Sequence, residues 1–159
     1  MRRGLLSIAS LALLLVVTAC EAPPGREESA AAAWTRAITA LRASADRAVQ
    51  DQDLATAEGD LSRALALPAP ERLEARLLTQ DLHFARGTVH FARRDPAAAL
   101  ASCDAGLAAG PRDSVFAANL YALRGMVLEA TGQALPAAEA YTEALRIHKA
   151  HYDAALEAP

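Results

Sequence analysis

The sequence predicts an all-α fold, an α-solenoid of about three helical hairpins. Alanine supplies about a quarter of the 159 residues, well above ordinary usage, and alanine and leucine are strong helix formers. β-Branched residues are few beyond residue 20, which disfavours strands. Helix-breaking residues recur at intervals and a residue pattern repeats, so we expect similar helical units that stack.

The first 19 residues have the features of a signal peptide. A short basic start precedes an apolar stretch from Leu5 to Val17, which is too short to span a membrane. The next residues, Thr18, Ala19 and Cys20, complete a run of one aliphatic residue, two small residues and a cysteine. This run resembles the lipobox of bacterial lipoproteins, which implies cleavage before Cys20 and a diacylglyceryl group on its thiol. The alternative is an ordinary secretory signal that contains a cysteine.

The lipoprotein resemblance also implies a location. Acylation of the new amino terminus would give Cys20 three acyl chains, and two already suffice for stable anchoring. In this family an aspartate after the cysteine retains the protein at the inner membrane, and this chain has Glu21 there. We therefore expect a cell-envelope protein held on the periplasmic face of the outer membrane. Residues 20–29, with prolines and charges, are expected to form a flexible tether to a helical domain over 30–159.

Proline and glycine mark the expected helix ends. The breaks are expected at Pro68/Pro70, Asp95-Pro96, Gly110-Pro111 and Thr131-Gly132. Asp95 is a plausible N-cap with Pro96 in the first helical position. Gly110 and Gly132 suit helix C-termini that need a left-handed residue. Short connections predict antiparallel hairpins, with units at about 30–71, 72–113 and 114–157.

A pattern of leucine, arginine-glycine and valine recurs 38 positions apart. It comprises Leu82, Arg86, Gly87 and Val89 in the first occurrence and Leu120, Arg124, Gly125 and Val127 in the second. The following helices align at the same offset, where Ala99, Cys103 and Leu107 match Ala137, Tyr141 and Leu145. A weaker, earlier copy contains Ala57, Leu61, Ala64 and Leu65. The helical domain is therefore expected to consist of three related units.

These units resemble the tetratricopeptide repeat, a helix-turn-helix family with small and bulky residues at fixed positions. The third copy has the expected residue types at Tyr121, Gly125, Leu128, Gly132, Ala137, Tyr141, Ala144 and Leu145. The second has Gly87, Ala99, Cys103, Gly106 and Pro111, with His83 and His90 at bulky positions. The resemblance implies that small residues lie where helices nearly touch. Residues assigned to repeat packing are Gly87, Ala99, Gly125, Ala137, Tyr141 and Ala144.

The spacing departs from the family. The aligned alanines Ala57, Ala99 and Ala137 are 42 and 38 residues apart, whereas the family period is about 34. We place the extra residues in longer first helices, including one long helix from Glu71 to Arg93. The segment from His148 to Leu156 is expected to extend the last helix as a cap, because end repeats need a polar outer face.

The resemblance implies a concave groove lined by the first helix of each unit. The groove residues that it implies are Asp81, Phe84, Thr88, Phe91, Asn119, Met126 and Glu129, to which the weak first unit adds Arg42 and Asp46. Phe84, Phe91 and Met126 would form an apolar floor, and such patches mark partner sites. The alternative is that Phe84 and Phe91 belong to the core. The lysines and asparagines with which some members clamp a C-terminal carboxylate are missing, so an apolar helix or extended peptide is the expected ligand.

Few residues suggest chemistry. The sequence contains no nucleophile beside a base, glycine-rich phosphate loop or carboxylate pair in a catalytic motif, so we expect no enzyme and no cofactor. His83 and His90 share a helix face, as do His148 and His151, but zinc needs three or four ligands and packing histidines are the favoured interpretation. Cys103 falls at a core position, where a thiol behaves as a small hydrophobic group.

The expected function is that of a membrane-anchored envelope lipoprotein, a scaffold or adaptor in the assembly of an envelope complex. Its partner would be another envelope protein or a peptide segment. The formal charge of −3 argues against nucleic acid, which needs a basic face. One alternative is a structural lipoprotein that assembles as a homo-oligomer, and another is a binder of metal or a small ligand through the histidines.

Overall fold

The computed structural model of the chain describes the backbone of residues 26–157 and the side chains of residues 29–157. These residues form helices α1 (Arg26–Gln50), α2 (Leu54–Leu65), α3 (Leu73–Ala92), α4 (Pro96–Ala109), α5 (Val115–Ala130) and α6 (Ala134–Glu157). The described part contains no strand, so the all-α prediction is confirmed. The expected signal peptide and the lipidated Cys20 lie outside the described residues.

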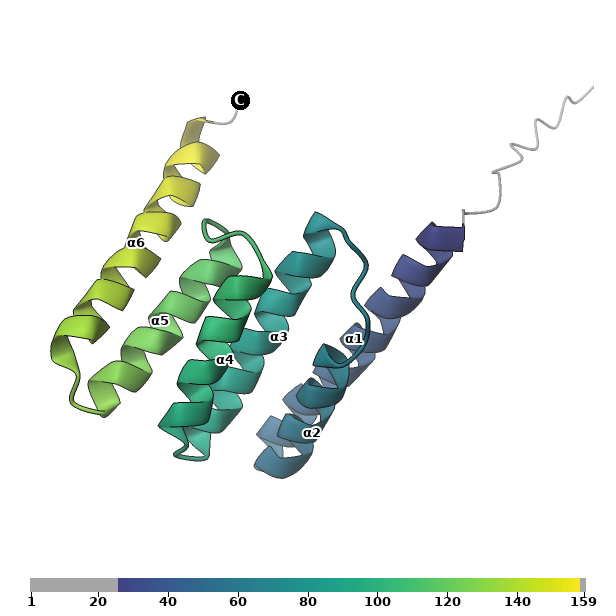
Figure 1. Ribbon diagram of the computed structural model, residues 1–159, viewed down its shortest axis with the longest axis horizontal. Helices are drawn as coiled ribbons and strands as arrows, with labels where there is room; N and C mark the ends of the chain where they lie inside the picture. Colours follow the sequence, from purple (N-terminus) through teal and green to yellow (C-terminus); the bar gives the residue numbers. More distant parts are fainter. Residues whose placement is uncertain (1–25, 158–159) are drawn as a thin grey trace, which may run out of the picture.

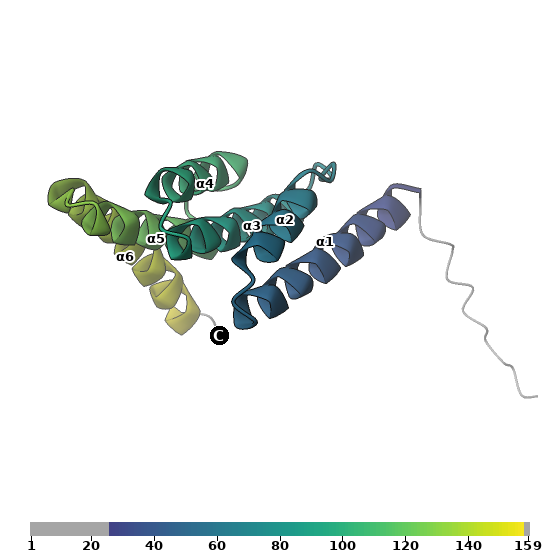
Figure 2. The same cartoon turned by 90° about the horizontal axis from the view of Figure 1, so that it is seen from below.

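Consecutive helices pair as hairpins, and the hairpins follow one another in a row (Figure 1). Helix α1 packs on α2, α3 on α4, and α5 on α6, while α2–α3, α4–α5 and α3–α5 contacts join the pairs. Helix α1 touches α3 less extensively than α5 does. Seen from below, α4 lies on one side of the row, and α1 and α6 lie on the other (Figure 2). Among the described helices, none is long and apolar enough to cross a membrane.

Several expected boundaries are confirmed. The Asp95 side chain caps α4 by accepting a hydrogen bond from the Ala98 amide, and Pro96 opens that helix. Gly132 ends α5 in the left-handed region, with φ of 79°. The predicted long helix from Glu71 to Arg93 is α3, which is shorter by two residues at its start and by one at its end.

Other expectations are wrong. Helix α1 begins at Arg26, so the expected tether over 20–29 is helical in its last four residues. The sequence predicts no break between α1 and α2, because the turn between them contains no proline or glycine. There Gln52 takes a left-handed φ of 61°, and Asp53 caps α2 by accepting a hydrogen bond from the Thr56 amide. A polar Asp-Gln-Asp turn thus ends α1 without proline or glycine.

Gly110 is also not the left-handed cap that the sequence predicted. Its backbone is extended, with φ of −146° and ψ of −172°. A Cβ atom at this position would lie 2.6 Å from Cδ of Gln80. Glycine is therefore needed because a buried side chain passes close to the backbone.

Gln80 forms a buried polar network between α3 and the loop before α5. Its side chain is fully buried, and its Nε2 donates to the Pro111 carbonyl at 3.0 Å. Its Oε1 accepts a hydrogen bond from Ser114 Oγ at 2.7 Å, and Ser114 Oγ in turn accepts from the Ala117 amide at 2.9 Å. The same serine therefore caps α5 and ties that helix to the preceding hairpin.

Of the residues assigned to repeat packing, Tyr141 is partly buried and the other five lie in the interior. Ala99, Ala137 and Ala144 are buried. A Cβ atom on Gly87 would lie 2.9 Å from Leu123 Cδ2 on α5, so the second hairpin approaches the third there. A Cβ atom on Gly125 would lie 2.6 Å from the Tyr141 ring, within the α5–α6 hairpin.

The last helix continues to Glu157, as expected, and its outer face combines exposed polar residues such as His148 and Lys149 with an apolar stripe. Leu145, Tyr152 and Leu156 are all exposed by more than 60%. Their spacing of seven and four residues places them on one stripe of α6. The end of the stack therefore presents an apolar stripe to solvent beside polar residues, so only part of it has the polar outer face expected of a terminal repeat.

Candidate functional site

Two neighbouring cavities follow the junction of α1 with α3. Their volumes are about 220 Å³ and about 150 Å³, and both are lined by Arg42 and Asp46. We call them together the α1–α3 groove. The first cavity is lined otherwise by Ile38, Thr39, Ala43, Leu78, Asp81 and Leu82. The second is lined otherwise by Ala45, Val49, Leu54, Leu61, Phe84, Ala85, Thr88, Val89 and Ala92.

The groove exists because α1 and α3 are joined mainly through α2. Helix α2 packs against both, and its Leu61 is buried in the core cluster that includes Ile38 and Leu82. Above this cluster, side chains from α1 and α3 do not close over one another. The result is an apolar depression that opens to solvent between the first helices of two successive hairpins.

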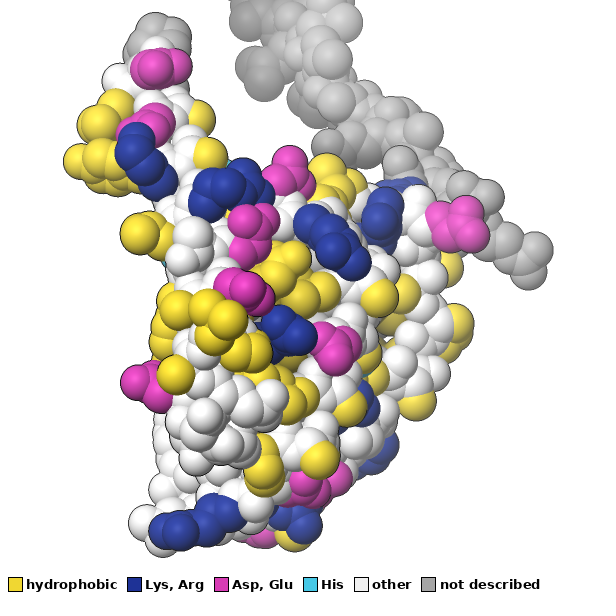
Figure 3. Space-filling model, turned by 60° about the vertical axis from the view of Figure 1, so that its left-hand side comes forward, with side chains coloured by type: hydrophobic (Ala, Val, Ile, Leu, Met, Phe, Trp, Pro, Cys, Tyr) yellow, Lys and Arg dark blue, Asp and Glu magenta, His cyan; other side chains and the backbone are white. Residues whose placement is uncertain are grey.

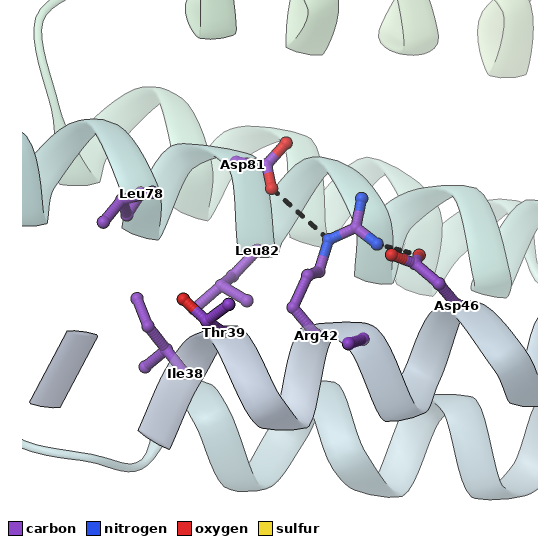
Figure 4. A pocket seen from close by; sticks show the side chains of 8 residues that line it. Ile38, Thr39, Arg42, Asp46, Leu78, Asp81 and Leu82 are labelled. Atoms are coloured by element: carbon purple, nitrogen blue, oxygen red, sulfur yellow. Dashed lines mark hydrogen bonds and ion pairs between the residues drawn. The ribbon is translucent and has the colours of Figure 1, made fainter. Parts of the chain in front are cut away.

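One arginine occupies the middle of the groove and meets two carboxylates (Figure 4). Arg42 Nε donates to Asp81 Oδ2 at 3.3 Å, which bridges α1 and α3. Arg42 Nη1 also pairs with Asp46, one turn further along α1. One guanidinium thus serves two carboxylates, and the charged lining of the groove is net negative by one unit.

The structure brings together only some of the groove residues that the sequence predicted. Asp81, Phe84 and Thr88 line the groove with Arg42 and Asp46. Thr88 is exposed, and Phe84 is half-buried and also packs against core residues toward α4 and α5. Phe84 therefore belongs both to the groove and to the core, so each of the two interpretations is right in part for this residue.

The remaining predicted residues lie elsewhere. Phe91 is half-buried against a core cluster formed by Ala99, Cys103, Leu123 and Val127, so it follows the core alternative. Met126 is 49% exposed on α5, and Asn119 is half-buried there. Glu129 is exposed and accepts a hydrogen bond from the Tyr141 hydroxyl at 2.8 Å. None of these four lines either cavity of the groove.

Sequence reasoning missed most of the apolar lining of the groove. Leu78 and Leu82 are four residues apart on α3 and flank Asp81, so the helical period alone could have placed them beside it. Ile38 and Val49 were harder to assign, because the first unit matches the repeat pattern weakly and its helix register was uncertain. The packing of α1 against α2 determines where these two side chains lie.

The histidines are dispersed. Burial and the neighbouring Arg86 lower the pKa of His83 to about 4, and its Nδ1 has no hydrogen-bond partner among the described residues. His90 lies 4.0 Å from Glu58, and burial lowers its pKa too. His151 Nε2 is 2.7 Å from the carbonyl oxygen of Asp113, whereas His148 is exposed. Within residues 29–157, no three metal-binding side chains converge on one point.

Cys103 lies in the core, as predicted. Its side chain is 0% exposed, and burial raises the pKa of its thiol to about 12. A thiol in this state is almost entirely protonated at neutral pH and is a poor nucleophile. The role of Cys103 is therefore to pack in the core.

The face seen from the α6 side shows hydrophobic side chains interspersed with acidic and basic ones (Figure 3). Several of these charges form pairs along single helices, such as Arg146 with Glu143 and Lys149 with Asp153. The side-chain hydrogen bond and charge of Arg146 lower the pKa of Glu143. Such exposed pairs contribute little to stability, because water screens them.

No family model, no curated protein and no solved structure matches this chain. The tetratricopeptide and lipoprotein resemblances therefore stay predictions that rest on the residues themselves. The functional argument rests on the α1–α3 groove and on the helix packing that creates it.

Proposed function

We propose that this chain is a lipid-anchored scaffold of the bacterial cell envelope that binds a protein partner in the α1–α3 groove. The proposal assigns it no catalysis and no cofactor. It combines the lipobox resemblance at Cys20 with a tetratricopeptide-like solenoid of three hairpins. The observation that carries it is the groove itself: an open apolar depression of two adjoining cavities between the first helices of successive hairpins. Apolar surface that is left open in this way favours burial by a partner.

The anchoring half of the proposal is tested by the Cys20→Ser variant. Cells that express the wild-type chain should incorporate labelled palmitate into it, and the chain should fractionate with the outer membrane. The Cys20→Ser variant should incorporate no label and should be lost from the membrane fraction. Equal membrane recovery of both chains without label would contradict the proposed lipid anchor.

The binding half is tested by site-specific photo-crosslinking in the native host. The probe replaces Val49 or Thr88, which are exposed residues that line the groove. The matched control carries the probe at Glu139, which is exposed on α6. A discrete adduct with another envelope protein from the groove positions alone would support the proposal. Adducts of equal yield from Glu139, or none from the groove, would contradict it.

A second candidate function is self-assembly as a structural lipoprotein. The exposed apolar stripe of Leu145, Tyr152 and Leu156 on α6 favours it, because a second copy could cover this end of the stack. Light scattering of the purified chain should then show a mass that rises with concentration. Replacement of Leu145 with glutamate should return it to the monomer mass, and a constant monomer mass of the wild type would exclude this alternative.

A further inference from the structure

We infer that the partner is an amphipathic helix that carries one basic side chain between two large apolar ones and enters the α1–α3 groove. This inference rests on the proposed function and specifies the chemistry of the partner. Three features of the groove carry it: its two apolar cavities, the distance between them, and the unequal number of carboxylates and guanidinium groups at its centre.

Each of the two cavities has apolar walls. Ile38, Leu78 and Leu82 surround one cavity, and the other is surrounded chiefly by aliphatic side chains together with the Phe84 ring. Away from the charged centre formed by Arg42, Asp46 and Asp81, these walls offer water few hydrogen-bond partners, so a hydrocarbon side chain is the favoured occupant of each cavity. Arg42 and Asp46 line both cavities and therefore lie where the two adjoin; Figure 4 shows them in the first cavity.

The spacing follows from the lining residues of α3. The first cavity is lined by Leu78 to Leu82 and the second by Phe84 to Ala92. Their centres are about seven to eight residues apart on α3, or about 11 Å at 1.5 Å per residue, whereas on α1 the lining residues are offset by about four residues, or about 6 Å. A partner helix that lies along the α3 wall covers the longer of these distances between positions i and i+7. Its residues at i+3 and i+4 then face the centre of the groove.

The charge at the centre selects a basic residue there. Asp46 and Asp81 share the single guanidinium of Arg42, so one carboxylate charge is uncompensated. The Asp46 side chain is 53% exposed and the Asp81 side chain 29% exposed, and both are reachable from the open side of the groove. A lysine or arginine of the partner balances this charge, whereas a glutamate there meets two carboxylates and is repelled.

The test uses the full chain in detergent micelles as bait for displayed 16-residue helical peptides. Positions i, i+3, i+4 and i+7 of the peptides are randomised. We expect enrichment of large apolar residues at i and i+7, with lysine or arginine at i+3 or i+4. The affinity of one enriched peptide is then measured by fluorescence anisotropy against variants of the chain.

The variants separate charge from shape. Asp81→Asn and Asp46→Asn keep the size of the side chain, and each should weaken binding by about 3- to 10-fold, as loss of a partly exposed charge pair does. Arg42→Gln should strengthen binding, because it frees both carboxylates for the peptide. Glu139→Gln removes the same charge outside the groove and should leave the affinity unchanged. Circular dichroism melts of each variant establish that it is folded.

The outcomes also separate this inference from the proposed function. Enriched peptides with an acidic or apolar centre would overturn the inference that the partner places a basic residue there. An affinity that is unchanged by Asp46→Asn and Asp81→Asn would overturn it too. The groove would remain a binding site if those peptides still crosslinked to a probe at Thr88. Failure to enrich any peptide would overturn the inference alone, whereas crosslinking only outside the groove would overturn the inference and the proposed function together.

Discussion

Helix α3 contacts the first helix of the hairpin on each side, and the two contacts differ. Toward α5 the approach is close, because Gly87 leaves room for Leu123 and the Gln80 network ties down the loop before α5. Toward α1 the approach is open, and the centre of the contact is an ion pair between Arg42 and Asp81. A repeated arrangement of helices thus produces a core at one junction and a groove at the other, according to the size and charge of the residues placed there.

The largest expected effect comes from adding one methyl group to the close region. Gly106 lies on α4, and a Cβ atom there would lie 2.7 Å from Leu120 Cδ1 and 2.9 Å from His83 Cβ. Leu120 is fully buried, and the His83 Cβ atom is attached directly to the α3 backbone, so it cannot rotate away. We expect Gly106→Ala to lower the free energy of unfolding by about 3 kcal/mol, measured by urea denaturation followed by circular dichroism.

The matched control is Gly59→Ala on α2. A Cβ atom at Gly59 would meet nothing within 4 Å, so only the helix propensity changes. This variant should gain about 0.5–1 kcal/mol, because alanine restricts the unfolded chain more than glycine does. If both variants shifted stability in the same direction, the close packing assigned to the α3–α4–α5 region would be wrong.

The second effect concerns the buried network that joins the second hairpin to the third. Gln80→Ala removes a donor and an acceptor at once and leaves the Pro111 carbonyl and the Ser114 hydroxyl without their partner. We expect a loss of about 2 kcal/mol in the free energy of unfolding. A double-mutant cycle with Ser114→Ala should show coupling between the two sites. Strictly additive losses would mean that the hydrogen bond between them contributes nothing.

This network shows how far the sequence could predict the structure. The helical class, the Asp95 cap and the Gly132 turn follow from local preferences, because each depends on neighbours within one turn of the chain. The role of Gly110 does not, because it depends on Gln80, which lies 30 residues earlier. The same limit applies to the groove. The residues on α3 could be assigned from a repeat pattern, but the apolar lining contributed by α1 depends on tertiary packing.

The third effect is a dependence of stability on pH at the α3–α4 contact. Burial and Arg86 lower the pKa of His83 to about 4 in the folded chain, whereas its ordinary value is 6.5. Between these values the unfolded chain binds more protons, so stability falls as the pH decreases from about 6.5 to about 4. We expect protonation of His83 to lower the free energy of unfolding by about 1 kcal/mol over this range. This is less than the full pKa difference would give, because His83 is partly in contact with water.

The measurement is a series of urea denaturations between pH 7.5 and pH 4.5, on the wild type and on His83→Gln. The variant should have a flatter profile, because glutamine takes up no proton. Profiles that run parallel would show that protonation of His83 does not oppose folding, and that the orphaned Nδ1 atom is solvated in solution.

The smallest expected effect on stability comes from the ion pair between Arg42 and Asp81, which joins α1 to α3. Arg42 and Asp81 are each more than a quarter exposed, and ion pairs of this kind contribute little to folding. Arg42→Gln and Asp81→Asn should therefore change the free energy of unfolding by less than about 0.5 kcal/mol. A loss as large as that of Gln80→Ala would show that this ion pair holds α1 onto α3 and that the groove is a structural joint.

The central claim, that the groove is occupied by a partner in the cell, is tested most directly by thiol labelling at a single engineered cysteine. Thr88→Cys places the thiol in the groove, and Glu139→Cys places one on α6 as a control for reagent access. Cys103 gives little background, because its thiol is buried and its pKa is about 12. The account predicts that labelling at position 88, relative to position 139, is several-fold lower in intact host cells than in the purified chain. The same ratio in cells and in the purified chain would contradict it.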